Sequence, residues 1–342
     1  MKDFIRKAVR CAHLTFEEAG QAMELVMTGV ATPAQLAGFL VALHTKGETA
    51  EEVAGFVSVM RRHAVRLRLE KPDAVDGCGT GGDSGGTFNI STAAALVAAA
   101  AGVTVAKHGN RSVSSRCGSA DLLEGCGANI DPGPEAVKQS IDRHGFGFMF
   151  APRFHPAMKY AATPRRELGL RTVFNMLGPM CNPAGVRRQL IGVYSKEIIP
   201  LVVDAMEMAG VEHLIVAHSR DGLDEFSIAG PTDYVELRAG NRMAGVLSPD
   251  EAGLTCHDSG SMVGGNPVRN VAILHQVLDG QDGAHREAVV LNAGTMIYVG
   301  GVADSITDGV RVAEEAIDTG KAAELLDVWI MATRAGGSSP TQ

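Results

Sequence analysis

Residues 76–92 read DGCGTGGDSGGTFNIST, with six glycines crowded directly before an alanine-rich segment. Glycine loses more backbone entropy on folding than any other residue and has no side chain to bury. A run this rich in glycine therefore does not suit the interior of a helix or a strand. It predicts a loop that some other group approaches very closely, lying between a strand near 73–77 and a helix over 93–101.

From about residue 73 onward, short apolar or β-branched runs alternate with helical segments. The strand-like runs are VTVA (103–106), QLIGVYS (189–195) and HLIVAH (213–218), and the helical segments include AAALVAAAA (93–101) and IIPLVVDAMEMAG (198–210). This alternation predicts an α/β fold with a mostly parallel central sheet covered by helices. Ligands of such sheets bind outside the carboxyl ends of the strands, where the glycine-rich loop would lie.

The first 65 residues predict helices instead, because the same start signal occurs three times. Each start pairs a threonine with Glu or Gln three residues later, the capping-box spacing: Thr15 with Glu18, Thr32 with Gln35, and Thr49 with Glu52. The apolar residues that follow repeat at helical spacing. They are Ala19, Met23, Val26, Met27, Leu36, Phe39, Leu40, Leu43, Val53, Phe56, Val57 and Met60. We predict a small N-terminal α-helical unit.

Bulk properties restrict the class of protein. A length of 342 residues suits two domains, and the net charge of −8 disfavours broad binding to nucleic acid or anionic membranes. The N-terminus lacks the apolar run of a signal peptide, and the six cysteines include no CxxC pair. We expect free thiols and a cytoplasmic location.

The segment GCGTGG (77–82) matches the G-x-G-x-x-G dinucleotide fingerprint, but its surroundings do not. The helix begins about ten residues too late, Asp83 follows the third glycine, and no acidic residue near 97–103 could hold a ribose. No Gly-Lys-Ser/Thr ends it as in a Walker A loop. Free loop amides followed by Asn89, Ser91 and Thr92 at a helix N-terminus favour phosphate binding. The alternative is that Asn89 or Ser91 merely caps the helix.

A second polar cluster, KHGNRSVSSRCGSAD (107–121), follows the strand VTVA. Lys107 could supply a point charge to a phosphate, and Asn110 and Ser119 could hydrogen-bond a polar substrate. The alternative is a solvated basic loop, which the position after a buried strand disfavours.

A third cluster, HSRDGLDEFS (218–227), places Asp224 beside Glu225 at the end of the strand HLIVAH. Adjacent carboxylates repel each other unless a cation lies between them. Mg²⁺ fits, because it takes one or two carboxylates together with phosphate oxygens and water. On its own, DGLDE is more often a simple polar turn, so this prediction depends on the two phosphate-type loops.

These three segments, together with HPAMKYAATPRRELGLRTVFNMLGPMCNPA (155–184), LTFEEA, KGET and the closing ADSITDGVRVAEEAIDTGKA, resemble the anthranilate phosphoribosyltransferase family over nearly the whole chain. The resemblance implies a small helical domain joined to a larger α/β domain similar to that of pyrimidine nucleoside phosphorylases. It places the helical domain at 1–72, joined by part of 155–180. The α/β domain would comprise 73–154 and 181–335, followed by a disordered tail, 336–342.

The resemblance also implies the site. Positions that hold phosphoribosyl pyrophosphate are matched by Gly79, Gly82, Asp83, Thr87, Asn89, Ser91, Thr92, Lys107 and Ser119. Positions for anthranilate are matched by Gly79, His108, Asn110 and Arg165, with Arg166 as the alternative if the alignment slips by one. Ser91, Asp224 and Glu225 match Mg²⁺ ligands, with two ions expected beside the bound substrate. Lys107, His108, Asp224 and Glu225 are the expected catalytic residues.

The implied reaction transfers the 5-phosphoribosyl group to the amine of anthranilate and expels pyrophosphate, a step of tryptophan biosynthesis. An aromatic amine is neutral at pH 7, so no strong base is required, and His108 could serve either proton transfer or structure. A homodimer is implied as well. Two alternatives are a pyrimidine nucleoside phosphorylase-like enzyme and a non-catalytic relative that binds nucleic acid, for which RRHAVRLR (61–68) is the basic run.

Overall fold

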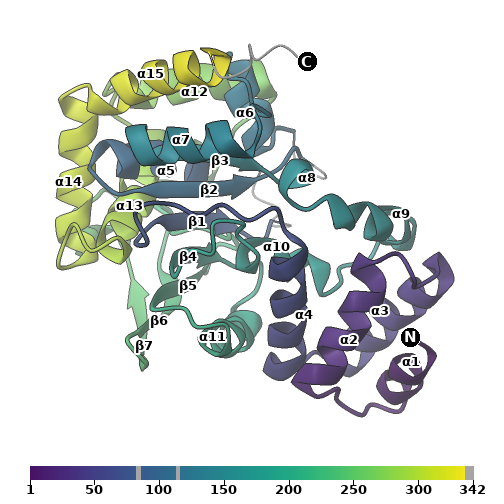
Figure 1. The fold of residues 1–342 in the computed structure, drawn as a ribbon. Coiled ribbons are helices and arrows are strands. Elements are labelled where there is room, and N and C mark those ends of the chain that lie inside the picture. Colours follow the sequence, from purple (N-terminus) through teal and green to yellow (C-terminus); the bar gives the residue numbers. More distant parts are fainter. Residues whose placement is uncertain (82–85, 113–115, 336–342) are drawn as a thin grey trace.

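The structure, a computed structural model, describes residues 1–81, 86–112 and 116–335. A small helical unit lies beside a larger α/β unit (Figure 1). The helical unit begins with α1 (Lys2–Val9), α2 (Phe16–Met27), α3 (Pro33–Lys46) and α4 (Ala50–His63). The sequence pointed to the last three of these helices but to no separate start for α1, which carries no capping box.

All three predicted capping boxes are present. In α2, α3 and α4 the threonine side chain accepts a hydrogen bond from the backbone of the third residue, whose own side chain accepts one from the threonine backbone N–H. Gly47 ends α3 with a positive φ of 81°. Every apolar residue predicted to face inward on these helices is buried. Local signals were sufficient here because each cap acts within one helical turn.

The corner between α3 and α4 contains a buried ion pair. Lys46 Nζ lies 2.7 Å from Glu52 Oε2, and the two side chains are 1% and 0% exposed. The second carboxylate oxygen accepts a hydrogen bond from the backbone of Leu14, 2.8 Å away. Because a buried carboxylate is costly unless paired and hydrogen-bonded, this pair fixes the turn that joins the helices to the segment before α2.

The larger unit is built on one seven-stranded sheet with the order β3-β2-β1-β4-β5-β6-β7. Its strands are β1 (Val75–Gly79), β2 (Val105–Gly109), β3 (Phe146–Phe150), β4 (Arg188–Gly192), β5 (His213–Ser219), β6 (Thr232–Arg238) and β7 (Asn241–Leu247). The first five strands are parallel, whereas β5, β6 and β7 pair antiparallel. The mostly parallel sheet is confirmed, and the terminal antiparallel hairpin was not foreseen.

The helices that follow β1 cover the two faces and the edges of the sheet or, after β3, pack back against the helical unit (Figure 1). They are α5 (Ile90–Ala100), α6 (Ser119–Gly125), α7 (Pro134–His144), α8 (Ala151–Phe154), α9 (Lys159–Leu168), α10 (Phe174–Met180), α11 (Ile199–Met208), α12 (Pro267–Leu278), α13 (Ala284–Val299), α14 (Ile306–Asp318) and α15 (Lys321–Ala335). Short 3₁₀ turns are η1 (Pro156–Met158), η2 (Lys196–Ile198), η3 (Pro249–Ala252) and η4 (Ser259–Met262).

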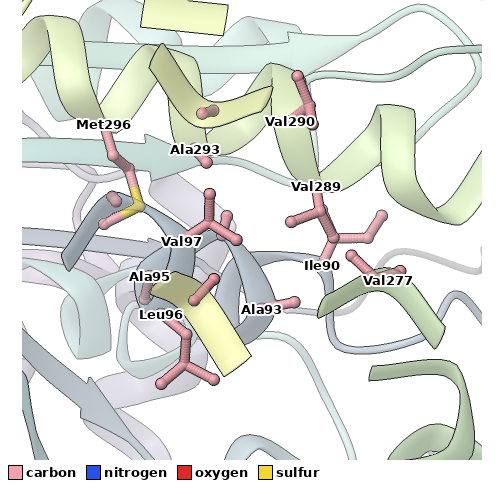
Figure 2. Close-up of a cluster of buried hydrophobic side chains, with 14 of the residues drawn as sticks. Ile90, Ala93, Ala95, Leu96, Val97, Val277, Val289, Val290, Ala293 and Met296 are labelled. Carbon is pink, nitrogen blue, oxygen red and sulfur yellow. The ribbon is translucent and has the colours of Figure 1, made fainter. Parts of the chain in front are cut away.

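Among the described residues, the two larger of three hydrophobic clusters lie against opposite faces of the sheet. Along β5, Leu214 and Val216 enter the core shared with the helical unit, whereas Ile215 and Ala217 enter the core of α5 and α13. This is the alternation expected of a strand buried on both faces. Figure 2 shows the second core, where the alanine-rich α5 packs beneath α13. Small side chains on α5 allow this close helix packing.

The segment after β3 returns to the helical unit. Helix α9 packs against α2 and α3, and α10 packs against α4. Ala161 and Phe174 are buried in the core that also holds Phe39 and Phe56. The domain boundaries drawn from the sequence stay a prediction, as does the tail 336–342, which lies outside the described residues.

All six cysteines carry free thiols. Within residues 1–81, 86–112 and 116–335, no helix is both long enough and apolar enough to span a bilayer.

Candidate active site

The candidate site lies where the strand order reverses. From β1 the chain builds outward through β2 and β3, then returns to place β4 and β5 on the other side of β1. The carboxyl ends of β1 and β4 are both glycines, and Gly79 pairs directly with Gly192. In open α/β sheets this reversal point opens a crevice for ligands.

Asp224, from the loop after β5, lies directly over this glycine pair. A methyl group on Gly79 would lie 2.1 Å from Asp224 Oδ2, and one on Gly192 would lie 1.5 Å from the Asp224 carbonyl oxygen. The same Oδ2 accepts a hydrogen bond from the Gly81 N–H at 2.6 Å. Glycine is therefore required at both positions for the Asp224 carboxylate to reach the sheet edge. This requirement explains why the glycine-rich loop has a glycine at position 79.

Helix α13 fixes the backbone just after this carboxylate. The buried side chain of Asn292 accepts a hydrogen bond from the Phe226 N–H at 3.0 Å and donates one to the Phe226 carbonyl at 2.8 Å. Asp224 is 6% exposed and Glu225 is half-buried. The backbone next to these two adjacent carboxylates is therefore fixed by Asn292 on one side, and Asp224 itself is fixed by the Gly81 N–H on the other.

The N-terminus of α5 also ends at this edge. Asn89 occupies the N-cap position but makes no capping hydrogen bond, and its side chain instead donates to the Cys117 carbonyl at 3.0 Å. The capping alternative for Asn89 is therefore wrong. Ser91 is half-buried and Thr92 is buried in the first turn. The Ile90, Thr92 and Ala93 N–H groups donate to the Phe88 and Asn89 carbonyls, so this helix start offers an anion mainly the helix dipole and the first turn around Ser91.

Lys107 lies under the glycine-rich loop rather than on a solvated surface. Its side chain is 1% exposed, and its ammonium donates to the Gly77 carbonyl at 2.8 Å. The buried carboxylate of Asp76 accepts hydrogen bonds from Asn182 Nδ2 at 2.7 Å and from the His108 N–H at 3.3 Å. Burial raises the pKa of Asp76, and the charge of Lys107 opposes this rise. For Lys107, the solvated-loop alternative is wrong.

His108 and His155 form a buried pair with ring centroids 5.0 Å apart. Neither Nε2 atom has a hydrogen-bond partner in the described part of the chain. Burial, together with the neighbouring His155, lowers the pKa of His108 to about 3, although a hydrogen bond to the Gly178 backbone opposes the shift. Burial lowers the pKa of His155 as well. Both rings are therefore neutral near pH 7, and each keeps a buried Nε2 without a hydrogen-bond partner among the described residues.

Among the described residues of the 107–121 cluster, Asn110 and Ser119 contact each other at the end of β2. The Asn110 N–H donates to Ser119 Oγ at 3.2 Å, and that hydroxyl donates to the Asn110 carbonyl at 3.1 Å. Arg111 forms ion pairs with Asp121 and Glu124, so its charge is neutralised locally. Asn110 itself is exposed.

Arg165 and Arg166 differ in their environments although they are adjacent. Arg165 is half-buried, and its guanidinium lies 5.1 Å from the centre of the Phe174 ring. Burial lowers the pKa of Arg165. Arg166 is exposed. The difference favours Arg165 as the residue that meets a buried ligand.

Two predicted site residues, Gly82 and Asp83, lie outside the described residues. Thr87 is described and forms an antiparallel bridge with Val263. Several residues that the sequence analysis did not single out belong to the site: Asp76, His155, Asn182, Gly192 and Asn292. Gly192 could have been found, because a glycine ending a predicted strand repeats the pattern of β1. The others are recognised only from tertiary contacts.

The donor chemistry fits Mg²⁺. Asp224, Glu225 and the Ser91 hydroxyl supply hard oxygen ligands, and the glycine pair leaves room for the Asp224 carboxylate. Across the residues that the structure describes, no group of three or more His, Cys, Asp or Glu side chains could hold a metal by itself.

Comparison with known families matches both units. Residues 71–323 match the glycosyl transferase family α/β domain, and residues 2–64 match the helical bundle domain of the same glycosyl transferase family. The anthranilate phosphoribosyltransferase of Pelotomaculum thermopropionicum is 48% identical over 94% of this chain and 93% of its own length. Anthranilate phosphoribosyltransferase 2 of Streptomyces coelicolor is 49% identical over 94% of this chain and 96% of its own length.

Solved structures agree. The crystal structure of anthranilate phosphoribosyltransferase from Thermus thermophilus superposes with a TM-score of 0.93 at 42% identity, covering 97% of this chain and 99% of its own. The enzyme from Saccharomyces cerevisiae, in complex with phosphoribosyl pyrophosphate and Mg, gives 0.90 at 26% identity, covering 98% of both chains. A further structure of the yeast enzyme contains 4-fluoroanthranilate.

Proposed function

The chain belongs to the anthranilate phosphoribosyltransferase family, and on this premise we propose that it transfers the 5-phosphoribosyl group of phosphoribosyl pyrophosphate to the amine of anthranilate, with Mg²⁺ as cofactor. The products are N-(5-phosphoribosyl)anthranilate and pyrophosphate, in tryptophan biosynthesis. One observation carries most weight: a buried carboxylate stands over paired glycines at the sheet edge where the strand order reverses.

The chemical difficulty is charge that builds on the leaving pyrophosphate as its bond to C1 of the ribose breaks. Groups that meet this charge accelerate the reaction rather than merely bind the substrate. In our proposal the phosphates are received by the glycine-loop amides, by the start of α5 with Asn89, Ser91 and Thr92, and by Ser119 at the start of α6. Lys107 contributes positive potential next to the loop, because its buried ammonium donates to the Gly77 carbonyl.

Asp224, Glu225 and Ser91 are the proposed Mg²⁺ ligands. When bound there, the ion would neutralise pyrophosphate oxygens. The chain's own part is to hold the two carboxylates at the sheet edge, which the contacts of Asp224 with the glycine pair and of Asn292 with Phe226 support.

For the acceptor, we propose that Arg165 pairs with the carboxylate of anthranilate and that the two imidazoles face its amine end. His108 is neutral with an unpaired, buried Nε2, so it suits accepting a hydrogen bond from an amine N–H and cannot act as an acid at neutral pH. His155 is likewise buried with a lowered pKa and an unpaired Nε2 in the described part of the chain. In this proposal His108 orients the nucleophilic amine. Gly79 and Asn110 are the remaining residues proposed to contact anthranilate.

No observation favours binding to nucleic acid. The basic run 61–68 is partly used inside the molecule: Arg61 Nε donates to the Met180 carbonyl at 2.9 Å, and Arg62 and His63 both contact Glu24. These contacts reduce the charge available to a polyanion.

We also propose a homodimer formed through the helical unit, and a cytoplasmic location. A groove of about 420 Å³ runs between α1, α3 and the end of α9, lined by Val9, Ala37, Val41 and Leu168 among others. Val9 is 66% exposed and Val41 39%. A contiguous apolar face on a small unit is a candidate contact between copies. Free cysteine thiols suit a reducing compartment.

The activity is tested by mixing the purified protein with phosphoribosyl pyrophosphate and Mg²⁺ and following the loss of anthranilate fluorescence. We expect loss that stops when EDTA is added. In a double variant, Asp224→Asn with Glu225→Gln, we expect kcat to fall on the order of 10²–10³, as for other lost transition-state charge stabilisation. A folded wild-type protein that leaves anthranilate unchanged would overturn the proposal, and a double variant with normal kcat would overturn the metal assignment.

A further inference from the structure

Residues 259–270, far along the chain, cover the loop that leads into α5. The Phe88 N–H donates to the Met262 carbonyl at 3.1 Å, and the Gly264 N–H donates to the Gly86 carbonyl at 3.0 Å. Between these two hydrogen bonds, Thr87 and Val263 form an antiparallel bridge. The loop assigned to the phosphates is therefore held by backbone pairing with a segment that the sequence analysis did not connect to it.

This contact is tight. A methyl group on Gly264 would lie 2.7 Å from both the backbone N and the Cα of Phe88, and 2.8 Å from Asn270 Oδ1. The segment and the loop could not approach this closely with any larger residue at this position. Helix α12 also packs into the core of α5 and α13, because Val277 of α12 and Ile90 of α5 belong to the same hydrophobic cluster (Figure 2).

Asn270 of α12 connects these parts by side-chain hydrogen bonds. It is 1% exposed. Its Oδ1 accepts from the Gly265 N–H at 2.7 Å, and its Nδ2 donates to Asn89 Oδ1 at 2.9 Å. The Nδ2 of Asn89 then donates to the Cys117 carbonyl at 3.0 Å. A chain of three hydrogen bonds thus runs from the 259–270 segment through Asn89 to the loop that precedes Ser119.

The direction of this chain is determined at both ends. One end is a backbone N–H, which only donates, and the other is a backbone carbonyl, which only accepts. Neither amide can flip without placing two acceptors or two donors against each other. The Asn89 side chain consequently has one satisfied orientation, and Asn270 selects it.

We propose that Asn270 is a positioning residue for phosphoribosyl pyrophosphate: it does not touch the substrate, but holds Asn89 so that residues 86–92 and 116–119 are arranged to receive the phosphates. This inference rests on the proposed function. It differs from a purely structural role, in which Asn270 would only stabilise the start of α12.

Asn270→Asp tests the distinction, because it keeps the size and the acceptor toward Gly265 but replaces the donor toward Asn89 with an oxygen. The matched control is Asn266→Ala on the same helix. Asn266 is the exposed N-cap of α12, and its Oδ1 accepts a hydrogen bond from the Arg269 N–H at 3.0 Å rather than contacting Asn89. The Asn266→Ala variant should therefore weaken the start of α12 without changing the hydrogen bonds of Asn89. If Asn270→Asp fails to fold, Asn270→Ala removes both side-chain hydrogen bonds of Asn270 without adding a charge.

Two measurements separate the outcomes. In the free protein, hydrogen–deuterium exchange of peptides containing Phe88 and Gly264 should be faster in Asn270→Asp than in Asn266→Ala. By calorimetry, with Mg²⁺ present, Asn270→Asp should raise the Kd for phosphoribosyl pyrophosphate roughly tenfold or more, the factor for one broken buried hydrogen bond. The KM for anthranilate should change little, and Asn266→Ala should lower Tm but bind normally.

Equal exchange and equal affinity in Asn270→Asp and wild type would overturn the inference. So would equal weakening of binding by Asn266→Ala, because helix stability would then explain the effect. If the wild-type protein does not bind phosphoribosyl pyrophosphate, the proposed function fails instead, and the exchange data still decide whether Asn270 holds the loop.

Discussion

At the residue scale, burial changes what two ordinary side chains can do. His108 is neutral because desolvation and His155 oppose its charge, so its free nitrogen is an acceptor at working pH. Arg165 keeps its charge because guanidinium has a very high intrinsic pKa, yet it is half-buried against Phe174. A cation held beside an aromatic ring is well suited to a flat aromatic carboxylate.

Arg165→Ala should mainly raise the KM for anthranilate. A charge-assisted hydrogen bond contributes roughly 1.5–3 kcal/mol, which corresponds to about a tenfold to hundredfold change. Steady-state kinetics with each substrate varied in turn will measure it. The KM for phosphoribosyl pyrophosphate should stay close to wild type.

Arg166→Ala is the control, since Arg166 is exposed on the same helix. We expect near-normal kinetics from it. If Arg166→Ala raises the KM for anthranilate and Arg165→Ala does not, the residue assignment is off by one position.

At the element scale, the site depends on where strands end. Gly79 and Gly192 are paired in register at the ends of β1 and β4, and the loop after β5 crosses both. Parallel pairing of β1, β4 and β5 brings these three ends to one edge. The position of Asp224 is thus a property of strand register rather than of the DGLDE turn alone.

Gly192→Ala should lower kcat/KM strongly, although neither glycine nor alanine has a side chain that could take part in the reaction. The new methyl group would lie 1.5 Å from the Asp224 carbonyl oxygen, so the loop must move away from the sheet edge. Displacement of a catalytic group by about 1 Å can cost on the order of 10²-fold in rate. We expect kcat/KM to fall by about that factor.

Gly230→Ala provides a comparison in the same region, because a methyl group there meets nothing within 4 Å. Its kcat/KM and Tm should match those of wild type. Full activity in Gly192→Ala would contradict the placement of Asp224 described above.

At the scale of the whole molecule, the chain crosses between its two units more than once. Helices α9 and α10 pack on the helical unit, although they follow β3 of the sheet, and α11 packs against α4. The two units therefore share one hydrophobic core, which includes Phe174 and Val202. The apolar face of α1 and α3 lies outside that core and remains exposed in a single copy.

A double variant, Val9→Asp with Val41→Asp, should convert the proposed dimer to a monomer. Burying an apolar side chain of this size contributes about 1.5–3 kcal/mol, and a buried unpaired carboxylate costs more still. Light scattering coupled to size-exclusion chromatography will give the mass of each form.

Val268→Asp is the matched control, because Val268 is 79% exposed but lies on α12, away from this face. It should leave the oligomeric state unchanged. A wild-type protein that runs as a monomer at micromolar concentration would overturn the proposed dimer.

Features that depend on near neighbours in the chain were readable from the sequence. The capping boxes at Thr15, Thr32 and Thr49 act within one turn, and the apolar spacing after them marks the buried faces. Strand–helix alternation predicted the parallel sheet, and the glycine-rich loop indicated a close approach. The hairpin of β6 and β7 escaped notice because β7 is largely exposed and lacks a clear apolar alternation.

The sequence by itself determined the fold class, the helical unit and the family, because propensity, capping and motif identity are local. Only the tertiary structure decided that Asp224 stands over Gly79 and Gly192, that His108 meets His155, and that Asn270 orients Asn89. Each of these contacts joins segments separated by dozens of residues or more. Strand register and core packing set such distances, and no local pattern encodes them.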